Sequence, residues 1–487
     1  MLRRSRETDK FRSKHGDQAG PSTGSLINPS GLMDSALQQI TDRVRAAAAN
    51  GTPLRIRGGG SKDFYGQSLQ GEVLDTTTLS GIISYEPSEL VVTARAGTPL
   101  RELEAALAEQ GQCLPFEPPH FGLQGGDWQN SGSGAGSPGT AGASVQATVQ
   151  ATGHATVGGM VAAGLSGPAR ASVGGVRDYM LGVQLLNGRA EHLTFGGQVM
   201  KNVAGYDVSR LMAGSMGTLG IITEVSLKVL PMAPAEATLV FDLDQAQALT
   251  QLHRWGGQPL PLNASCWVHD DAARPVVAGG GTGAQPGPQA DGRASGHSGG
   301  GAGGGAIGAA RGGLDAKAGG KAEEMGRLYV RLRGAIAAVE SACKSMLRQA
   351  AGKRMDNAPA ASDWQACRDL RLPFFANPPH PGMALWRLSV AQTAPPLNLP
   401  WPQLVEWHGG LRWLWAPLDS AARVREAAAQ AGGNATLFIS NYQGVALATA
   451  KFDSFSALNS PLDEVHRRLK AEFDPAGIFN RNRLFRS

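Results

Sequence analysis

The sequence predicts an α+β protein, and three features of the 487-residue chain indicate this class. Residues 156–230 carry many glycines beside apolar, strand-like residues. From residue 232 onward, strand-like and helix-like segments mix in a way typical of two βαβ units on one antiparallel sheet. Two low-complexity stretches, 121–153 and 279–320, are predicted to be disordered Gly-rich insertions in surface loops.

Length and composition indicate two or three domains with their own cores. The net charge of +5 is too small for a general polyanion-binding surface, so we expect no nucleic-acid partner. The four cysteines form no CxxC pair, which excludes a zinc ribbon and a ferredoxin-type iron–sulfur site; they are Cys113, Cys266, Cys343 and Cys367. Scattered thiols are typical of a reducing compartment.

The N-terminal segment and the hydropathy pattern predict the location. Residues 1–31 are basic but lack the apolar core of a signal peptide, and we interpret them as a disordered leader. No apolar run is long enough to span a bilayer. We therefore expect a cytoplasmic protein, with at most peripheral association at the inner face of the cell membrane through partners.

The first part of the chain alternates helices with short strands. A helix is predicted over 32–49, with Leu37, Ile40 and Val44 on one face. A second helix is predicted to start at Pro99, with Thr98 as its N-cap, and to stop at Gly111. Strands are predicted over 54–57, 73–74, 82–85 and 90–94, and a rigid proline loop over 114–120.

The strand at 54–57 runs directly into Gly58-Gly59-Gly60-Ser61-Lys62. Several backbone N–H groups of such a loop can converge on one point, which suits a phosphate. The loop is not a Walker A motif, because no Gly-Lys-Ser/Thr occurs, and not a Rossmann fingerprint, because the third glycine is missing. A hairpin turn is the alternative, although three consecutive glycines exceed what a turn needs.

The glycines between residues 156 and 230 admit two interpretations. Glycine supplies no core and is costly to order, so its repeated use favours a backbone that approaches a bulky cofactor closely. The alternative is a set of tight turns in a β-rich domain. The pattern alone leaves both open.

The second half of the chain is predicted to contain further strands and helices. The strands are expected over 237–241, 264–268, 328–332, 385–390, 411–414 and 435–439. The helices are expected over 244–255, 335–350, 362–370, 421–431 and 462–473.

Six motifs agree in order and spacing: RGGGSK (57–62), LPFEPPH (114–120), ATVGGMVAAGLSGP (155–168), GGVRDYMLG (174–182), KNVAGYDVSRLMAGSMGTLGIITE (201–224) and FDPAGIFN (473–480). Together they resemble the vanillyl-alcohol oxidase-type FAD-binding family, also called the PCMH-type FAD-binding family. Within it, the chain is similar to the FAD-binding E subunits of bacterial glycolate oxidases, and the WHGGLRW stretch at 407–413 adds to that similarity.

The resemblance implies a domain division. It predicts a PCMH-type FAD-binding domain of two subdomains over 32–231 and an α+β, ferredoxin-like cap domain over 232–455. A C-terminal helix and tail over 456–487 are expected to return to the FAD domain.

The resemblance also implies which residues bind FAD. A first loop holds the pyrophosphate through Arg57, Gly58, Gly59, Gly60 and Ser61, and Pro118 and Pro119 line the flavin side. A second loop comprises Thr156, Val157, Gly158 and Gly159, with Gly164 close by. Gly174 lets the chain pass the cofactor, and the ribityl and adenine parts are wrapped by Gly217, Gly220 and Ile222.

The sequence also departs from the family. Many relatives tether the flavin through a histidine near the first loop; Ser61 and Lys62 stand there instead, so we expect non-covalent FAD. Related D-2-hydroxyacid dehydrogenases bind a metal through two cap histidines seven positions apart. No two of the ten histidines have that spacing, so we expect no metal and have no catalytic residue to name.

Several single residues have a structural and a functional interpretation. His120 is expected to be a hydrogen-bonded loop residue rather than a group facing the flavin, and Arg177-Asp178 a structural ion pair rather than a substrate contact. Lys201 could also lie near the flavin, but this interpretation is not the favoured one. Four tryptophans are expected in the core or an interface: Trp401, Trp407, Trp413 and Trp415.

The resemblance implies an FAD-binding subunit of a complex that oxidises glycolate, a small 2-hydroxyacid, to glyoxylate. The expected partners are a sister FAD-containing subunit with the hydroxyacid site and an iron–sulfur subunit that takes the electrons. One alternative is a stand-alone FAD-dependent dehydrogenase of another hydroxyacid or alcohol. The other is a non-catalytic FAD-domain scaffold.

Overall fold

A computed structural model describes residues 29–67, 70–121, 154–197, 207–269, 325–376, 378–380, 382–440 and 452–484. Residues 1–28 of the predicted leader and the insertion at 279–320 lie outside these ranges, as does Lys201. Residues 29–31, which were also assigned to the leader, instead begin the first helix, so the leader was predicted too long. Of the insertion predicted over 121–153, only Phe121 is described, and it is buried.

The first half of the chain forms a five-stranded antiparallel sheet. Its strands, in spatial order, are β3 (Ile82–Glu86), β4 (Val91–Arg95), β8 (Ile221–Lys228), β6 (Met180–Leu186) and β7 (His192–Gly196). Helices α2 (Leu100–Glu109) and α4 (Val157–Ala163) share one apolar cluster with this sheet. The sheet is therefore the platform that positions the segment after Thr156.

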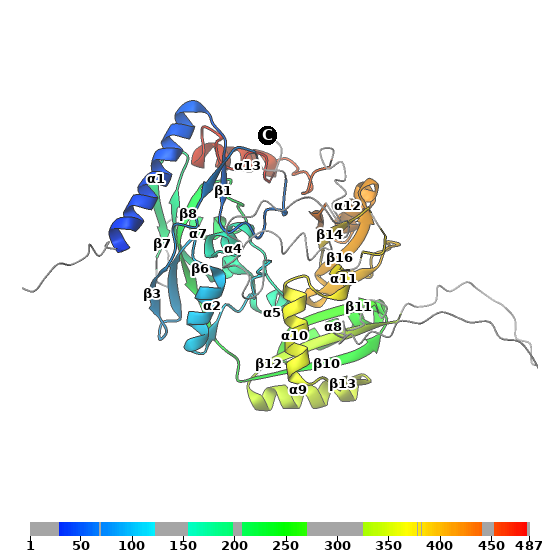
Figure 1. Cartoon of the computed structure of the whole chain (residues 1–487). Helices are drawn as coiled ribbons and strands as arrows, with labels where there is room; N and C mark the ends of the chain where they lie inside the picture. Colours follow the sequence, from blue (N-terminus) through cyan, green and yellow to red (C-terminus); the bar gives the residue numbers. More distant parts are fainter. Residues whose placement is uncertain are drawn as a thin grey trace, which may run out of the picture.

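A second, smaller unit carries the first glycine loop. Helix α1 (Pro29–Asn50) packs on the parallel pair β1 (Leu54–Arg57) and β2 (Glu72–Asp75). The residues after helix α13 (Leu462–Phe473) run beside β1, where Leu54 pairs with Phe479. Figure 1 shows α13, in red, on the side of the molecule that holds α1 and β1. The C-terminal segment thus completes the support of the first loop.

The second half forms an eight-stranded antiparallel sheet made of two four-stranded parts. The first part contains β10 (Ala235–Leu243), α8 (Gln245–Gly256), β11 (Leu262–His269), β12 (Gly326–Gly334), α9 (Ile336–Gln349) and β13 (Gly352–Arg354). The spatial order β13-β10-β12-β11 is that of a ferredoxin-like βαββαβ unit.

The second part repeats this strand order without the first helix. Its elements are β14 (Met383–Ser389), β15 (Gln403–Glu406), β16 (Leu411–Pro417), α12 (Ala421–Gln430) and β17 (Asn434–Ile439). Strands β11 and β15 join the two parts into one sheet. The expectation of two related units on one antiparallel sheet is confirmed, and the short strands β13 and β15 are additions to it.

Further short elements lie within the two halves or between them. They are the pair β5 (Gln112–Cys113) and β9 (Leu230–Pro231), the helices α5 (Arg170–Val173), α6 (Val176–Tyr179), α7 (Val208–Leu211), α10 (Asn357–Arg368) and α11 (Pro373–Ala376), and the 3-10 turns η3 (Trp407–Gly409) and η4 (Leu418–Ser420). Helix α5 packs against β11 and η3 of the large sheet, close to where the two halves meet in Figure 1.

The interface between the halves is an apolar cluster that draws on both. Tyr65, Phe121 and Leu165 of the first half pack with Leu385, Trp413 and other residues of the large sheet. In β14, Met383 and Leu385 face this cluster, whereas Ala384 and Trp386 face the opposite side. Because side chains alternate along a strand, Arg387 points toward the first half.

Two local predictions are wrong. Thr98 does not cap the helix that follows it: the N-cap position of α2 is Pro99, and the Thr98 hydroxyl donates instead to the Gly81 carbonyl at 3.1 Å. The segment from Thr156 to Gly159 is not a loop throughout, because α4 begins at Val157.

Candidate functional site

The first glycine loop packs against the segment that leads into α4. A Cβ on Gly59 would lie 2.0 Å from the backbone oxygen of His154, and one on Gly58 would lie 2.5 Å from Thr156 Oγ1. His154 N donates to Gly59 O at 3.1 Å. Neither position accepts a side chain, because it would collide with the His154 backbone at Gly59 and with the Thr156 side chain at Gly58.

Charged groups surround the same loop. Asp63 Oδ2 accepts from Arg55 and from Arg57, each at 2.7 Å. Gly60 has φ +78°, and a Cβ there would collide with the Arg57 guanidinium. Burial lowers the pKa of Lys62 to about 8, although Asp369 acts to raise it. Two arginines share one carboxylate, so the loop retains an excess of positive charge.

A cavity of about 90 Å³ opens at this loop. Its lining unites residues predicted from two distant motifs: Arg57, Gly58, Gly59, Gly60, Ser61, Thr156 and Gly159. The N–H groups of Gly58 and Gly59 donate to no acceptor among the described residues. Backbone donors beside Arg57 and Lys62, with no side chain in the way, fit a phosphate-bearing group.

Helix α4 fixes the second segment. Thr156 is its N-cap, with Oγ1 accepting from Gly159 N at 3.2 Å, and Gly164 ends the helix in the left-handed conformation at φ +64°. Val157 is fully buried, and a Cβ on Gly158 would lie 2.6 Å from Ala96. Val157 and Gly158 therefore hold α4 onto the five-stranded sheet.

The other predicted glycines lie outside the 90 Å³ cavity. Gly174, at φ +91°, turns the chain against Asp178, and Gly220 packs on Leu186. Gly217 is closer, because a Cβ there would lie 2.6 Å from Nδ2 of Asn480, which lines the cavity. Ile222 is buried in β8.

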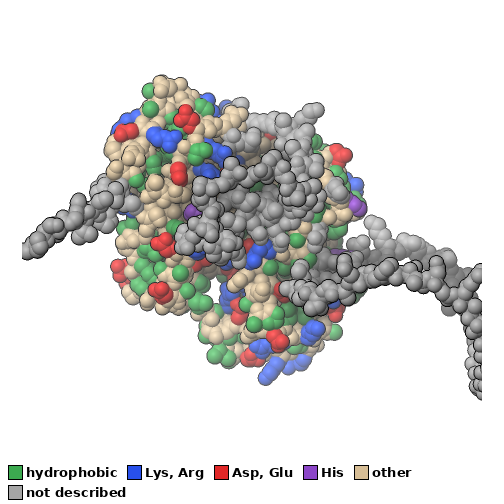
Figure 2. Space-filling model, in the orientation of Figure 1, with side chains coloured by type: hydrophobic (Ala, Val, Ile, Leu, Met, Phe, Trp, Pro, Cys, Tyr) green, Lys and Arg blue, Asp and Glu red, His purple; other side chains and the backbone are tan. Residues whose placement is uncertain are grey.

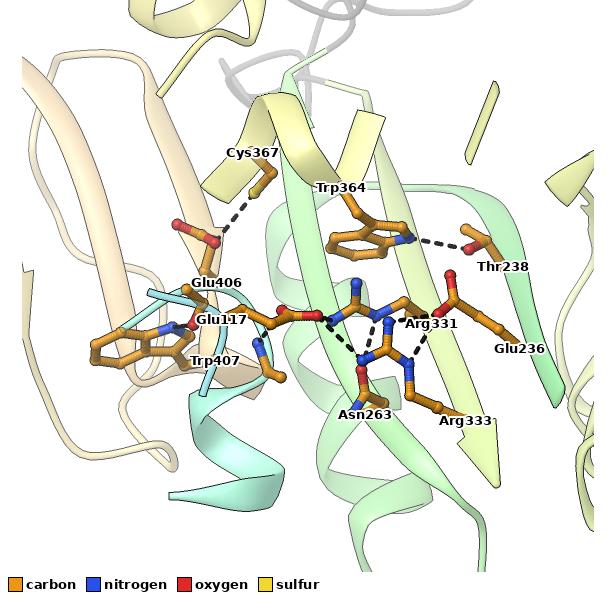
Figure 3. A network of polar contacts seen from close by, with 12 residues as sticks. Glu117, Glu236, Thr238, Asn263, Arg331, Arg333, Trp364, Cys367, Glu406 and Trp407 are labelled. Carbon is orange, nitrogen blue, oxygen red and sulfur yellow. Dashed lines mark hydrogen bonds and ion pairs between the residues drawn. The ribbon is translucent and has the colours of Figure 1, made fainter. Parts of the chain in front are cut away.

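The proline loop is tied to the large sheet by Glu117 (Figure 3). Arg331 Nη2 donates to both carboxylate oxygens of Glu117 at 2.7 Å, and Arg333 Nη1 donates to one at 3.1 Å. Ala169 N adds a hydrogen bond of 3.2 Å. Burial alone would raise the pKa of Glu117, but the two arginines lower it below its usual range. Glu117 is thus an ionised link between the halves, directly before Pro118 and Pro119.

A second, smaller cavity of about 20 Å³ is lined in part by this loop. Pro119, Ser166, Arg387 and Glu406 are among its lining residues, whereas Pro118 is buried outside it. Glu406 accepts from Cys367 Sγ at 3.1 Å and from Trp413 Nε1 at 2.7 Å. Burial raises the pKa of Glu406 to about 7, outweighing these hydrogen bonds and the nearby Arg387.

The single-residue expectations have different outcomes. His120 Nε2 contacts Glu104 at 2.8 Å and its backbone N–H donates to Asp369, which confirms a hydrogen-bonded loop residue. Asp178 does not pair with Arg177 but accepts from Gly175 N at 2.8 Å, because it caps α6. The tryptophans are core residues: Trp407, Trp413 and Trp415 are buried, and Trp401 packs at the edge of two clusters.

Sequence reasoning missed two residues of the C-terminal segment. Asn480 Oδ1 accepts from Ile56 N at 2.8 Å, and Asn480 Nδ2 donates to Met216 O at 2.7 Å. Arg483 Nη2 donates to the carbonyl of Lys62 at 3.1 Å. Both line the 90 Å³ cavity. The asparagine that ends the FDPAGIFN motif was the available signal.

Within the described ranges, no group of three or more His, Cys, Asp or Glu side chains could hold a metal ion. In the same ranges, no helix is long and apolar enough to cross a membrane. Figure 2 shows acidic, basic and apolar side chains interspersed over the described surface of one face, without a large area of one charge sign.

The comparisons with known proteins identify the fold that carries this cavity as that of an FAD-binding oxidoreductase. The family described as "FAD binding domain" matches residues 35–140. Among solved structures, alkyldihydroxyacetonephosphate synthase is similar with a TM-score of 0.54 and 14% identity, covering 91% of this chain and 75% of the other. That similarity shows the fold.

Named relatives show to which family of FAD-binding proteins the chain belongs. The glycolate oxidase subunit GlcE of Escherichia coli K12 is 35% identical over 448 residues, which is 92% of this chain and 97% of the relative. The D-2-hydroxyglutarate dehydrogenase of Xanthomonas citri pv. viticola is 25% identical over 51% of this chain and 46% of its own length. The glycolate oxidase subunit GlcD of Bacillus subtilis is 35% identical over 20% of each chain. The chain belongs to the GlcE family of FAD-binding glycolate oxidase subunits.

Proposed function

We propose that this chain is the FAD-binding subunit of a glycolate oxidase complex that oxidises glycolate to glyoxylate. The observation that carries the proposal is the 90 Å³ cavity, where the first glycine loop meets the N-terminal end of α4 beside Arg57 and Lys62. The nearly full-length similarity to the GlcE subunit supports it. FAD, when bound, supplies the acceptor for the hydride that leaves the substrate carbon.

The proposal assigns roles to this chain's own residues. Backbone N–H groups of Gly58 and Gly59 bind the pyrophosphate, and Arg57, Gly60 and Ser61 shape the loop around it. Thr156 and Gly159 form the facing wall, backed by Val157, Gly158 and Gly164. Pro118 and Pro119 lie on the flavin side, whereas Gly174, Gly217, Gly220 and Ile222 support the chain around the remainder of the cofactor. FAD is held non-covalently.

The domain division forms part of the proposal. Residues 32–231 together with 456–487 act as the FAD domain, and 232–455 act as the cap. The partners are a sister FAD-containing subunit and an iron–sulfur subunit that takes the electrons onward. The complex is cytoplasmic, with at most peripheral membrane association through those partners.

A matched pair of glycine variants tests the cofactor site. A Cβ on Gly59 would lie 2.0 Å from the His154 oxygen, whereas a Cβ on Gly256 would meet nothing within 4 Å. We expect the purified wild-type chain and Gly256→Ala to show flavin absorption bands, and Gly59→Ala to lose them. Acid precipitation should release the flavin into the supernatant, because no covalent bond holds it.

Co-purification tests the subunit role. A tagged copy of this chain, expressed with a sister flavin subunit and an iron–sulfur subunit, should retain both through size-exclusion chromatography and reduce a dye with glycolate. A flavin-loaded chain that assembles with neither subunit would contradict the proposal.

A further inference from the structure

Two of the four cysteines, which are scattered in the sequence, meet in the structure. Cys266 on β11 and Cys367 on α10 belong to one apolar cluster, and their thiols are in hydrogen-bonding contact. They are 4% and 3% exposed, and both are free thiols. Cys343 is also 4% exposed, but it packs in the cluster on the opposite face of the sheet. The fold therefore builds one thiol pair and leaves an equally buried cysteine outside it.

A cavity of about 750 Å³ gives access to this pair. It lies between α10 and the first part of the large sheet, and Cys266 and Cys367 are both among its lining residues. Asp242 lines the same cavity with a side chain that is 79% exposed, so the cavity reaches the surface of the protein. A small uncharged molecule can therefore enter from solvent and reach the two sulfur atoms.

A carboxyl group lies beside the thiol pair. Cys367 Sγ donates to Glu406 Oε1 at 3.1 Å, as the dashed line in Figure 3 shows. Glu406 is also the cross-strand partner of Cys266, since β15 pairs with β11 at this point. Trp413 Nε1 donates to the second carboxyl oxygen at 2.7 Å, which fixes the orientation of the group. The carboxyl is thus held where it can take the proton of the Cys367 thiol.

The charges around these groups determine when the proton can move. Burial raises the pKa of Glu406 to about 7, although Arg387 on β14 acts to lower it; Glu117 of the proline loop acts to raise it. The hydrogen bond with Cys266, burial and the nearby Glu406 raise the pKa of the Cys367 thiol well above its usual range. Because the thiolate is the reactive form, Cys367 needs a proton acceptor in order to react at neutral pH.

We propose that Cys266 and Cys367 form a dithiol site that a hydroperoxide entering the 750 Å³ cavity oxidises to an intramolecular disulfide. The site is separate from the FAD-binding role and does not require a bound flavin. The disulfide joins α10 to β11 and removes the hydrogen bond from Cys367 to Glu406. Asp369 follows α10 and accepts from the His120 N–H, so the modification lies close to a link between the proline loop and the large sheet.

The oxidation takes place in two steps. The Glu406 carboxylate takes the Cys367 proton, and the sulfur attacks one oxygen of the hydroperoxide. The O–O bond breaks, the leaving oxygen receives the proton as an alcohol or water, and Cys367 becomes a sulfenic acid. The sulfur of Cys266 then attacks that of Cys367, an S–S bond forms, and the hydroxyl leaves with the Cys266 proton as water. Two thiols lose two electrons, and the hydroperoxide gains them.

The experiment is a peptide map of the purified full chain after treatment with hydrogen peroxide, with the remaining thiols alkylated before digestion. We expect one linked pair of peptides, which contain Cys266 and Cys367, and a fall from four free thiols to two that dithiothreitol reverses. Cys343→Ala is the matched control and should form the same disulfide. Cys266→Ala should form none, and its Cys367 should be trapped by dimedone as a sulfenic acid.

The pH profile tests the role of Glu406. The rate of thiol loss in the wild type should rise through about pH 7 and level off above about pH 8, because the carboxyl is then fully ionised. In Glu406→Gln the rate should keep rising about tenfold per pH unit, as direct ionisation of a thiol requires. A wild-type rate without this plateau would remove Glu406 from the first step. Four free thiols after peroxide treatment, a different cysteine pair, or sulfinic acids without a disulfide would each overturn the proposal.

Discussion

Replacing Glu117 with alanine should remove the ionic link between the proline loop and the large sheet. The carboxylate of Glu117 is 16% exposed and receives hydrogen bonds from Arg331, which is 3% exposed, and from Arg333, which is 28% exposed. In Glu117→Ala, Arg331 keeps only its hydrogen bond to Asn263 and its position over the Trp364 ring. A nearly buried guanidinium then has no anionic partner.

The magnitude follows from that burial. Removing one partner of a buried ion pair typically costs 3–5 kcal/mol, and we expect about 3 kcal/mol here because Arg333 retains Glu236 and solvent. Glu236→Ala is the matched control: it breaks only the more exposed pair with Arg333, for which we expect about 1 kcal/mol or less.

Urea unfolding followed by tryptophan fluorescence measures the difference, because the buried tryptophans among the described residues lie in the second half, on or beside the large sheet. The pKa of Glu117 is lowered in the folded protein, so its stabilising effect is present above the unfolded-state pKa and is lost as pH falls through the folded value. The gap between wild type and Glu117→Ala should therefore shrink in acid, below about pH 4. Equal stability of the two proteins at pH 7 would refute the reasoning.

Three further substitutions test other parts of the structure. Thr156→Ala removes the N-cap bond to Gly159 and should cost about 1 kcal/mol and lower the flavin content, as followed by thermal melting and absorption. Gly217→Ala combines φ +71° with a contact to Asn480 and should lower stability by about 1–2 kcal/mol; an unchanged melting temperature would contradict this. Glu406→Gln should gain less than roughly 3 kcal/mol above pH 7: a raised carboxyl pKa destabilises the folded state once the group is ionised, but the amide keeps only one of the two acceptors used by Cys367 and Trp413, and below about pH 4 the variant should be no more stable than wild type.

Periodicity predicted the regular elements well where local preference and tertiary role agree. Strand β1 and helix α13 have the predicted bounds, and α8 buries Ala248, Leu249 and Leu252 as its pattern indicates. Strand β13 is three exposed residues that become a strand only by pairing with β10. Helix α4 escaped prediction because Gly158 and Gly159 disfavour a helix, at roughly 1 kcal/mol each.

The cavity-lining glycines could be predicted from sequence, but their polar surroundings could not. Glu117 and Arg331 are 214 positions apart, and no local pattern records their pairing. Arg387 on β14 and Glu406 on β15 lie on the two strands that flank β16. Their proximity depends on the pairing of β15, a strand that the sequence did not predict. Such groups are brought together by strand order, which single-sequence periodicity does not encode.

The sequence left open whether the glycines form tight turns or let the backbone approach a cofactor closely. At Gly58, Gly59 and Gly158, an added Cβ would meet the chain itself: Thr156, His154 and Ala96, respectively. The immediate reason for these glycines is therefore close packing of protein segments. That packing brings the loop after β1 within hydrogen-bonding distance of His154, in the segment that leads into α4, and the cavity lies where the two segments meet. Gly59 thus lets two backbones come together at the edge of the cavity, which makes Gly59→Ala a more informative change than a substitution that only fills the cavity.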